Sequence, residues 1–307
     1  MSVKGFFQDS GPIGVGMWLG RHCSLRTGRK LAGFAAGIIS AFKRGKMIQA
    51  IKANQWVASG ETLNRAELAA RSRQVTHNII TALFEYFYYY QHVEEARQRI
   101  VLSPEMRSLL EDSAQRGKPQ IVLGPHLGNF DLFGTMMVKL GLKVVALSYP
   151  KPNKTYQAQN ALREQSGMRV MPINLSAFRE AKKLMLHEGY SLVTGVDRPI
   201  ESKDDQKYKP AFFGRPANLS TYYVRLARET GAVVRVACGV TRQDGMFYYD
   251  CTPPIAFEEY ENLTDDIVLN AEKVMRAAEK FIQAYPEQWA MFYPIWPEAL
   301  EQIKHLS

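Results

Sequence analysis

The chain has 307 residues and a formal net charge of +9, with 46% hydrophobic and 22% charged residues, which is ordinary for a folded protein with a large core. Its three cysteines (Cys23, Cys238 and Cys251) are scattered without disulfide or metal-ligand spacing, which indicates free thiols in a reducing compartment. No run of 18 apolar residues occurs and the first residues lack a signal-peptide layout, so we expect neither a spanning helix nor secretion.

The positive charge is concentrated at the start of the chain. Residues 1–59 contain nine Lys or Arg residues and a single acid, Asp9. The apolar run from Leu31 to Phe42 lies within this region and is too short to cross a bilayer. A basic helix with an apolar face is typical of a segment that lies on an anionic membrane surface. A core-packed helix with a solvated basic face would give the same pattern, whereas few aromatic residues and no binding motif argue against nucleic acid.

The remainder of residues 1–100 is predicted to be helical and membrane-associating. Asn64 and Glu67 form a capping-box pattern that opens a helix ending near Arg99. The aromatic run Tyr86–Tyr90 within it is interpreted as core, with the border of a lipid-binding groove as the alternative. The early glycines lack a preceding strand and dinucleotide spacing, and they predict a flexible lead-in: Gly11, Gly14, Gly16 and Gly20.

From residue 101 strands and helices alternate. Strands are expected at 121–123, 143–148, 169–172, 190–194, 232–240 and 246–251. Helices are expected after Ser103-Pro104 and at 130–140, 153–166, 176–188, 218–230 and 264–284, with a charged loop at 201–209. This alternation predicts an α/β fold in which helices flank a mostly parallel central sheet. Residues 101–307 would be the core, which together with residues 1–100 can form one structural domain.

The turn after the strand at 121–123 carries the pattern that bears most on function. Gly124-Pro125 ends the strand and Asn129 can cap the next helix, so His126 lies in the turn and Asp131 in the first helical turn. Ligands bind at such strand ends in open α/β sheets. If the His126 ring folds back towards Asp131, the pair forms a general base whose tautomer an acid holds. A chance His and Asp at this spacing, with a purely structural role, is the alternative.

Other charged residues follow strands or lie in loops. Asp197 and Arg198 end the strand at 190–194, and Arg163 and Arg215 lie on a helix and in a turn. Such arginines bind phosphate or carboxylate groups bidentately, with a surface ion pair as the alternative for each and the favoured interpretation for Arg163 taken alone. The sequence has no Gly-x-Ser-x-Gly elbow, phosphate-binding Gly-Lys-Ser/Thr loop or metal pattern among its histidines. A His base without a protein nucleophile favours direct attack by a substrate hydroxyl, with no metal and no cofactor.

Taken in order, these motifs resemble the bacterial lipid A biosynthesis acyltransferase family, including its phosphatidylinositol mannoside acyltransferases. The resemblance covers most of the chain and depends on a His-x4-Asp signature and five further features: Asn54, Arg163 ahead of Gly167, Val196-Asp197-Arg198, Phe212–Pro216 and Tyr285–Trp289. Two features depart from the family. The start of the chain has no spanning segment, and Met291–Pro297 stands where basic residues are usual, which leaves the acceptor lipid open.

The resemblance implies a peripheral enzyme on the cytoplasmic face of the inner membrane. It would move an acyl chain from acyl-CoA or acyl carrier protein to a hydroxyl of a glycolipid or related membrane lipid. His126 would be the general base and Asp131 its acid partner, with backbone N–H groups near Gly128 and Asn129 stabilising the oxyanion. Headgroup and donor phosphates would be bound by the remaining candidates: Arg163, Asp197, Arg198, Gly214 and Arg215.

Two other classes stay open at this stage. A membrane-associated glycosyltransferase would need a metal and nucleotide-sugar site, and no Asp-x-Asp pair in a strand-end loop provides one. A non-catalytic lipid-binding protein would share the basic apolar start of the chain but would not need a His-Asp turn.

Overall fold

The computed structural model describes residues 3–42, 45–115, 119–150, 152–200 and 208–306. Its centre is a seven-stranded sheet with the order β1-β9-β8-β2-β5-β3-β4. The strands are β1 (Ile100–Leu102), β2 (Gln120–Gly124), β3 (Val144–Ser148), β4 (Arg169–Pro172), β5 (Ser191–Gly195), β8 (Val233–Thr241) and β9 (Phe247–Cys251). All neighbours pair in parallel except β8 and β9. The predicted α/β class with a mostly parallel sheet is confirmed.

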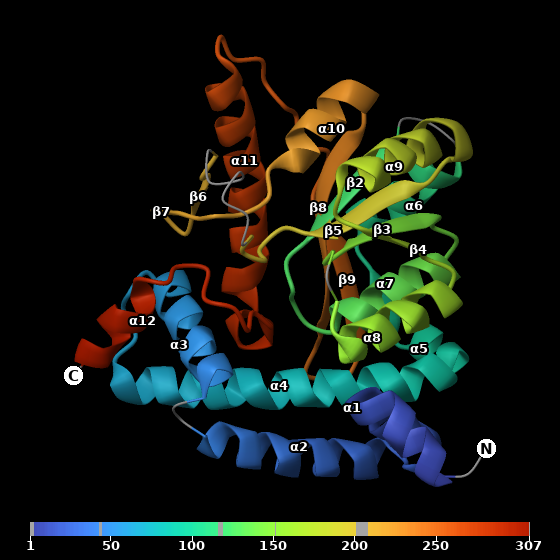
Figure 1. Cartoon of the computed structure of the whole chain (residues 1–307), viewed down its shortest axis with the longest axis vertical. Coiled ribbons are helices and arrows are strands. Elements are labelled where there is room, and N and C mark those ends of the chain that lie inside the picture. Colours follow the sequence, from blue (N-terminus) through green and yellow to red (C-terminus); the bar gives the residue numbers. More distant parts are fainter. Residues whose placement is uncertain (1–2, 43–44, 116–118, 151, 201–207, 307) are drawn as a thin grey trace.

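Helices cover both faces of this sheet. On β2, Ile121 and Leu123 face one apolar cluster and Val122 faces the other, as alternation along a strand requires. The first cluster is closed by α9 (Leu175–Glu188), α10 (Tyr222–Thr230) and α11 (Leu263–Ala284). The second is closed by α6 (Pro104–Ala114), α7 (Phe130–Lys139) and α8 (Lys154–Gln165) (Figure 1). Burial on both faces explains why β2 reads as an unbroken apolar run.

A helical layer runs along one edge of the molecule (Figure 1). It consists of α1 (Val3–His22), α2 (Leu25–Ala41), α3 (Lys46–Ala58), α4 (Arg65–Gln91) and α5 (Val93–Gln98). The predicted capping box opens α4, since the Asn64 side chain accepts from Glu67 N and the Glu67 carboxylate accepts from Asn64 N. The long predicted helix is interrupted at His92, where α4 ends and α5 begins.

The prediction of a flexible glycine-rich lead-in is wrong, because these glycines lie within α1. A Cβ at Gly16 would approach the Phe87 ring to 2.2 Å, and one at Gly20 would lie 2.6 Å from the Phe87 backbone. Gly16 and Gly20 therefore let α1 lie directly against α4. Tertiary packing accounts for these two, although glycine is a poor helix former in isolation.

Helix α2 is amphipathic and lies on the outer side of α4 (Figure 1). Its buried stripe is small (Gly28, Ala32 and Ala36), and an ion pair of 2.6 Å between Arg29 and Glu85 fastens it to α4. A second stripe is exposed and apolar: Leu31, Phe34, Ile38 and Phe42. Lys43 and Arg44, part of the basic pattern, lie outside the described residues. Within the described chain, no helix combines the length and apolarity needed to cross a membrane.

Several short elements were not predicted. They are the hairpin of β6 (Ala211–Phe212) and β7 (Arg215–Pro216), η2 (Pro286–Gln288), α12 (Ala299–Gln302) and η3 (Ile303–His305). Helix α10 begins at Tyr222 and not at Asn218, because the Asn218 side chain donates to Ile200 O and Leu219 bridges Pro199. Most of the predicted charged loop, residues 201–207, lies outside the described residues.

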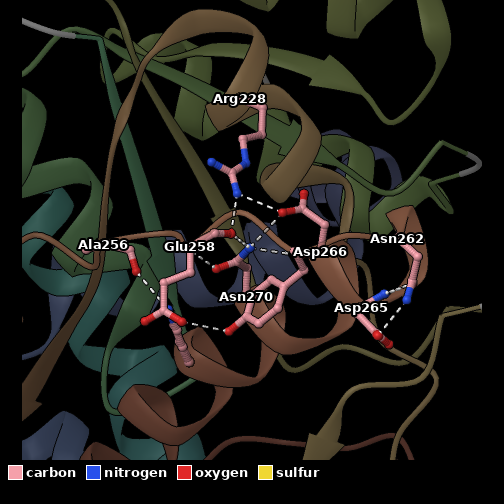
Figure 2. A network of polar contacts seen from close by, with 9 residues as sticks. Arg228, Ala256, Glu258, Asn262, Asp265, Asp266 and Asn270 are labelled. Atoms are coloured by element: carbon pink, nitrogen blue, oxygen red, sulfur yellow. Dashed lines mark hydrogen bonds and ion pairs between the residues drawn. The ribbon is translucent and has the colours of Figure 1, made fainter.

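A polar network fastens the segment after β9 to α10 and α11 (Figure 2). Arg228 donates to the Asp266 carboxylate at 2.7 Å and to the Glu258 carbonyl. Asn270 Nδ2 donates to Glu258 O and Asp266 O, both at 2.8 Å, while its Oδ1 accepts from Glu258 N at 2.9 Å. The fully buried Asn270 therefore has its polar atoms bonded, and the network is structural.

Candidate active site

The register between β2 and β5 brings His126 and Asp197 together. These parallel neighbours pair Gly124 with Gly195, so the residues two positions further along each chain meet beyond the sheet edge. His126 Nδ1 lies 2.6 Å from Asp197 Oδ1, and His126 N donates to Asp197 Oδ2 at 2.9 Å. A carboxylate only accepts, so Nδ1 carries the proton and Nε2 is left as the basic nitrogen.

Asp197 is fully buried and is held by a third donor. Trp289 Nε1 donates to Oδ2 at 2.8 Å. Burial alone would raise the pKa of Asp197, but the charge and hydrogen bonds of His126 and the Trp289 hydrogen bond outweigh it and lower the pKa below its usual value. The carboxylate is therefore ionised at neutral pH and can stabilise an imidazolium on His126.

The expected contact between His126 Nδ1 and Asp131 is wrong in this structure, because Asp197 occupies that place. Asp131 lies in the first turn of α7, as predicted, but its carboxylate accepts from Arg163 Nε at 2.9 Å and Nη2 at 2.7 Å. Gln159 donates to the other oxygen. Asp131 and Arg163 are thus a partly buried ion pair beside the base, in which one carboxylate oxygen accepts from two guanidinium N–H groups. A catalytic role for Asp131 itself stays a prediction.

The turn after β2 is braced by the motif at 285–290. Gly128 N donates to Gln288 O at 2.9 Å, and Ala290 N donates to His126 O at 2.7 Å. Gly128 has φ +61°, and a Cβ there would lie 2.1 Å from Gly239 O, so only glycine fits. Its N–H already donates to Gln288 O and is not free for an oxyanion in this structure, and the oxyanion role expected of the backbone near Gly128 stays a prediction.

Asn129 has two structural contacts. Its Oδ1 accepts from Leu132 N at 3.3 Å, which caps α7 as predicted, and its Nδ2 donates to Ala82 O of α4 at 2.8 Å. The side chain thereby joins the catalytic turn to the helical layer. An oxyanion role for its backbone N–H stays a prediction.

Two neighbours set the position of the imidazole ring. A Cβ at Gly195 would lie 2.7 Å from His126 Cε1, so a side chain there would push the ring away. The Phe130 ring packs edge-on against His126, with 4.9 Å between the centroids. The ring is therefore held between the end of β5 and the start of α7.

Arg198, predicted to bind substrate, lies among three tyrosine rings. Its guanidinium carbon is 4.8 Å from the ring centroid of Tyr149, 5.8 Å from that of Tyr156 and 4.6 Å from that of Tyr293. Burial opposes ionisation of Tyr156, but Arg163, Ser148 and Arg198 together lower its pKa. Arg198 thus adds a positive charge beside the ion pair of Arg163 and Asp131.

Gly214 and Arg215 are not brought to His126. They lie in the β6–β7 hairpin, where Arg215 Nε donates to Glu61 at 2.9 Å and the guanidinium stacks on Trp56. The hairpin reaches the site only through packing, since Phe212 and Phe213 contact the Trp289 ring. The described contacts give Arg215 a structural role, and its binding of substrate stays a prediction.

Two cavities meet at the turn. One of about 130 Å³ is lined by His126, Asp131, Tyr156, Arg163 and Gly195 among others. A second of about 250 Å³ shares Phe130 and Asp131 with it and is otherwise mainly apolar. Its lining includes Ile13 of α1 and Phe292. Five further lining residues come from α4: Ile79, Ala82, Leu83, Tyr86 and Phe87. The aromatic run therefore serves both predicted purposes, as core and as a border of an apolar cavity.

Trp289 is the residue of the site whose contact the sequence did not predict. Its only signal was its place in the Tyr285–Trp289 motif, which carried no chemistry by itself. No group of three His, Cys, Asp or Glu side chains in the described part of the chain could hold a metal ion. The arrangement instead offers a His base, a buried acid behind it and an apolar cavity beside it.

Comparison with known proteins gives one result. The model of a family described as bacterial lipid A biosynthesis acyltransferase matches residues 71–298, which is most of the chain and includes the whole site. No curated protein matches the sequence.

Proposed function

Because the chain belongs to the bacterial lipid A biosynthesis acyltransferase family, whose members are acyltransferases, we propose that it transfers a fatty acyl chain from a thioester donor to a hydroxyl of a glycolipid or related membrane lipid. The observation that carries the proposal is the His126–Asp197 pair, 2.6 Å between Nδ1 and Oδ1, beside a cavity that shares Phe130 and Asp131 with a mainly apolar one. A base beside an apolar cavity fits an acyl donor, whose chain is apolar and whose carbonyl is reactive.

The chemistry follows from the free nitrogen of His126. Nε2 takes the proton of the acceptor hydroxyl while the oxygen attacks the thioester carbonyl. Asp197 keeps Nδ1 protonated and stabilises the imidazolium that forms. When the tetrahedral intermediate collapses, the carbon–sulfur bond breaks and the thiolate takes the proton from Nε2. One thioester and one alcohol become one ester and one thiol, without a covalent enzyme intermediate.

The surroundings fit the two substrates. The acyl chain would lie in the cavity between Phe130 and Phe292, and its end would reach residues of α4 and α1. Arg163 and Arg198 would attract the phosphates of an acyl-CoA or acyl carrier protein donor, or those of the acceptor. Asp131 would keep Arg163 in place as a positioning residue, because its Oδ1 accepts from two N–H groups of the guanidinium.

The exposed stripe of α2 supports membrane attachment. Phe34 is 72% exposed and Phe42 68%, next to a basic sequence, which is the arrangement of an interfacial helix. We place the enzyme at the surface of the cytoplasmic leaflet of the inner membrane, where both acyl carriers and the acceptor lipid are accessible.

The test measures thiol release from palmitoyl-CoA and from palmitoyl-acyl carrier protein, with and without a glycolipid extract. The wild type should release thiol from at least one donor when the extract is present, and His126→Ala should reduce that rate by about 10³-fold or more, because the general base is lost. His187→Ala, on the exposed side of α9, is the control and should retain the wild-type rate. Thiol release at the wild-type rate by His126→Ala, or no extract-dependent release from either donor, would refute the proposal.

A further inference from the structure

A large groove lies apart from the active site, between the helices of the N-terminal layer and the C-terminal residues. Its volume is about 1220 Å³, and it is lined by α2, α3, α4 and residues 303–306. None of its lining residues lines either cavity at His126. Cavities for drug-sized molecules span roughly 300–1,000 Å³, so this groove has room for a larger ligand.

The groove is basic. Lys52, Arg65, Arg73 and Lys304 are among its lining residues, and no acidic residue of the described chain lines it. Lys304 pairs with Glu301 at 2.6 Å. Arg65 and Arg73 are both exposed on α4, and neither has an ion-pair partner among the described residues. Two guanidinium groups that lack a carboxylate within the protein are suited to a phosphate ligand.

Below these cations the groove is apolar and built from small residues. Ala36, Ile48 and Leu68 are buried and form its floor. On α2 the wall includes Gly33 and Gly37, and a Cβ at Gly37 would have no atom within 4 Å. Glycine is less favourable than alanine inside a helix, and among the described residues no neighbour of Gly37 requires it. The glycine leaves open space next to the apolar floor.

The groove adjoins the surface proposed above to contact the membrane. Gly37 is followed in the chain by Ile38, which belongs to the exposed apolar stripe with Phe34 and Phe42. Helix α2 therefore lines the groove with residues such as Gly33 and Gly37 and exposes a neighbouring apolar stripe to solvent. A ligand that has both a charged headgroup and apolar chains could enter from a membrane surface along this helix.

We propose that the groove binds one anionic phospholipid of the membrane, at a site separate from acyl transfer. Arg65 and Arg73, eight positions apart on α4, attract the anionic headgroup, and the acyl chains lie over Ala36, Ile48 and Leu68. Basic pockets at a membrane surface favour anionic headgroups. The acyl chains of a phospholipid would cover the apolar floor, whereas a free phosphate ion would leave it exposed. The site rests on the membrane attachment proposed for α2, but not on the chemistry of His126.

The experiment counts lipids on the full-length protein by native mass spectrometry, after purification in mild detergent and addition of phosphatidylglycerol or phosphatidylcholine. The wild type should retain one phosphatidylglycerol and little phosphatidylcholine. Gly37→Phe fills the groove without changing the charge, and Arg65→Gln/Arg73→Gln removes the phosphate ligands. Each should reduce the retained phosphatidylglycerol at least tenfold.

Two controls match these variants. Gly37→Ala keeps the groove open, and Arg107→Gln/Lys280→Gln removes two exposed cations from α6 and α11. Both should retain the lipid. Retention by Gly37→Phe and by the Arg65/Arg73 variant, equal retention of phosphatidylcholine, or displacement by millimolar inorganic phosphate would overturn the proposal. If circular dichroism shows that Gly37→Phe has lost helix, the double arginine variant decides.

A separate readout distinguishes this proposal from the proposed function. His126-dependent thiol release from a water-soluble short-chain thioester should be unchanged in Gly37→Phe. If the protein retains phosphatidylglycerol but transfers no acyl chain, the proposed function is refuted and the phospholipid site stands. If it transfers the acyl chain but retains no phosphatidylglycerol, the phospholipid site is refuted and the proposed function stands.

Discussion

The catalytic turn and the outer face of α2 are built in opposite ways. The turn at His126 is held by Asp197 from the end of β5 and by Gln288, Trp289 and Ala290 from the C-terminal part of the chain. The outer face of α2 is largely exposed to solvent, and Phe34 on it is 72% exposed. Chemistry needs groups held in advance, whereas contact with a membrane needs uncovered apolar surface. Variants in the two regions should therefore separate reaction rate from membrane binding.

We expect the largest loss of kcat for Asp197→Asn. This variant also distinguishes Asp197 from Asp131 as the acid partner of His126. The amide can no longer stabilise an imidazolium and can hold the wrong tautomer, so we expect kcat to fall by about 10³–10⁴-fold. Asp131→Asn should cost less, because it weakens the bond to Arg163 and leaves the His126–Asp197 pair intact. Thiol-release kinetics of both variants, with circular dichroism as the folding control, make the comparison. A greater loss for Asp131→Asn would return Asp131 to the role of acid partner.

The contrast between these two acids shows what the sequence can predict of the site. His126, the strand before it and the Asn129 cap follow from local patterns, and they were predicted correctly. Asp197 was recognised as a candidate but given a substrate-binding role. Its true position depends on β5 being the neighbour of β2 in parallel register, and strand order is set by tertiary packing, not by local sequence.

Two other expectations differ from the structure for the same physical reason, because the contact that decides each of them lies far away in the sequence. The Gly128 N–H seemed available for an oxyanion because helix starts expose such groups, but it bonds a carbonyl 160 residues further along the chain, that of Gln288. The glycines of α1 appeared flexible because their contact, Phe87, lies far away in the sequence. Periodicity and capping predict most elements, whereas contacts between distant segments decide what their residues do.

The next largest effect is expected for Gly195→Ala. The added Cβ would lie 2.7 Å from His126 Cε1, so the ring must move while β5 and its pairing remain. A displacement of about 1 Å at a reacting group can cost roughly 10²-fold, and we expect a loss of this order in kcat with little change in Tm. Gly37→Ala, where the added Cβ has no atom within 4 Å, is a glycine control outside the site and should retain the wild-type kcat. A wild-type kcat in Gly195→Ala would contradict the prediction, because it would show that the His126 ring can accommodate the added Cβ without loss of catalysis.

A smaller effect, visible mainly in the pH profile, is expected for Trp289→Phe. The indole N–H is one of the groups that lower the pKa of Asp197, so its removal should raise that pKa. His126 acts as a base only while Nε2 is unprotonated, so the acid limb of kcat reports the uptake of a proton by the His126–Asp197 pair. A carboxylate that has lost one hydrogen bond is more basic, so the pair takes up this proton at higher pH. The acid limb of kcat should therefore move to higher pH in the variant, with a modest loss at neutral pH.

Trp296→Phe is the matched control, since Trp296 is equally buried and packs on the same Phe212 but does not contact Asp197. Its acid limb should stay where it is in the wild type. An equal shift in both variants would indicate loosened packing and not the loss of one hydrogen bond.

The smallest effect on chemistry is expected in the other region, for Phe34→Ser/Ile38→Ser on α2. Each apolar side chain buried in a membrane contributes roughly 1.5–3 kcal/mol, so binding to phosphatidylglycerol vesicles in a flotation assay should fall at least tenfold. Hydrolysis or transfer of a water-soluble short-chain thioester should not change, because neither residue lines a cavity at His126. Leu175→Ser/Leu186→Ser removes two exposed leucines of α9 and should leave vesicle binding intact. If the α9 variant loses vesicle binding and the α2 variant keeps it, the membrane contacts the side of the molecule that α9 covers. The prediction that α2 provides membrane binding and the His126 turn provides catalysis would then be wrong.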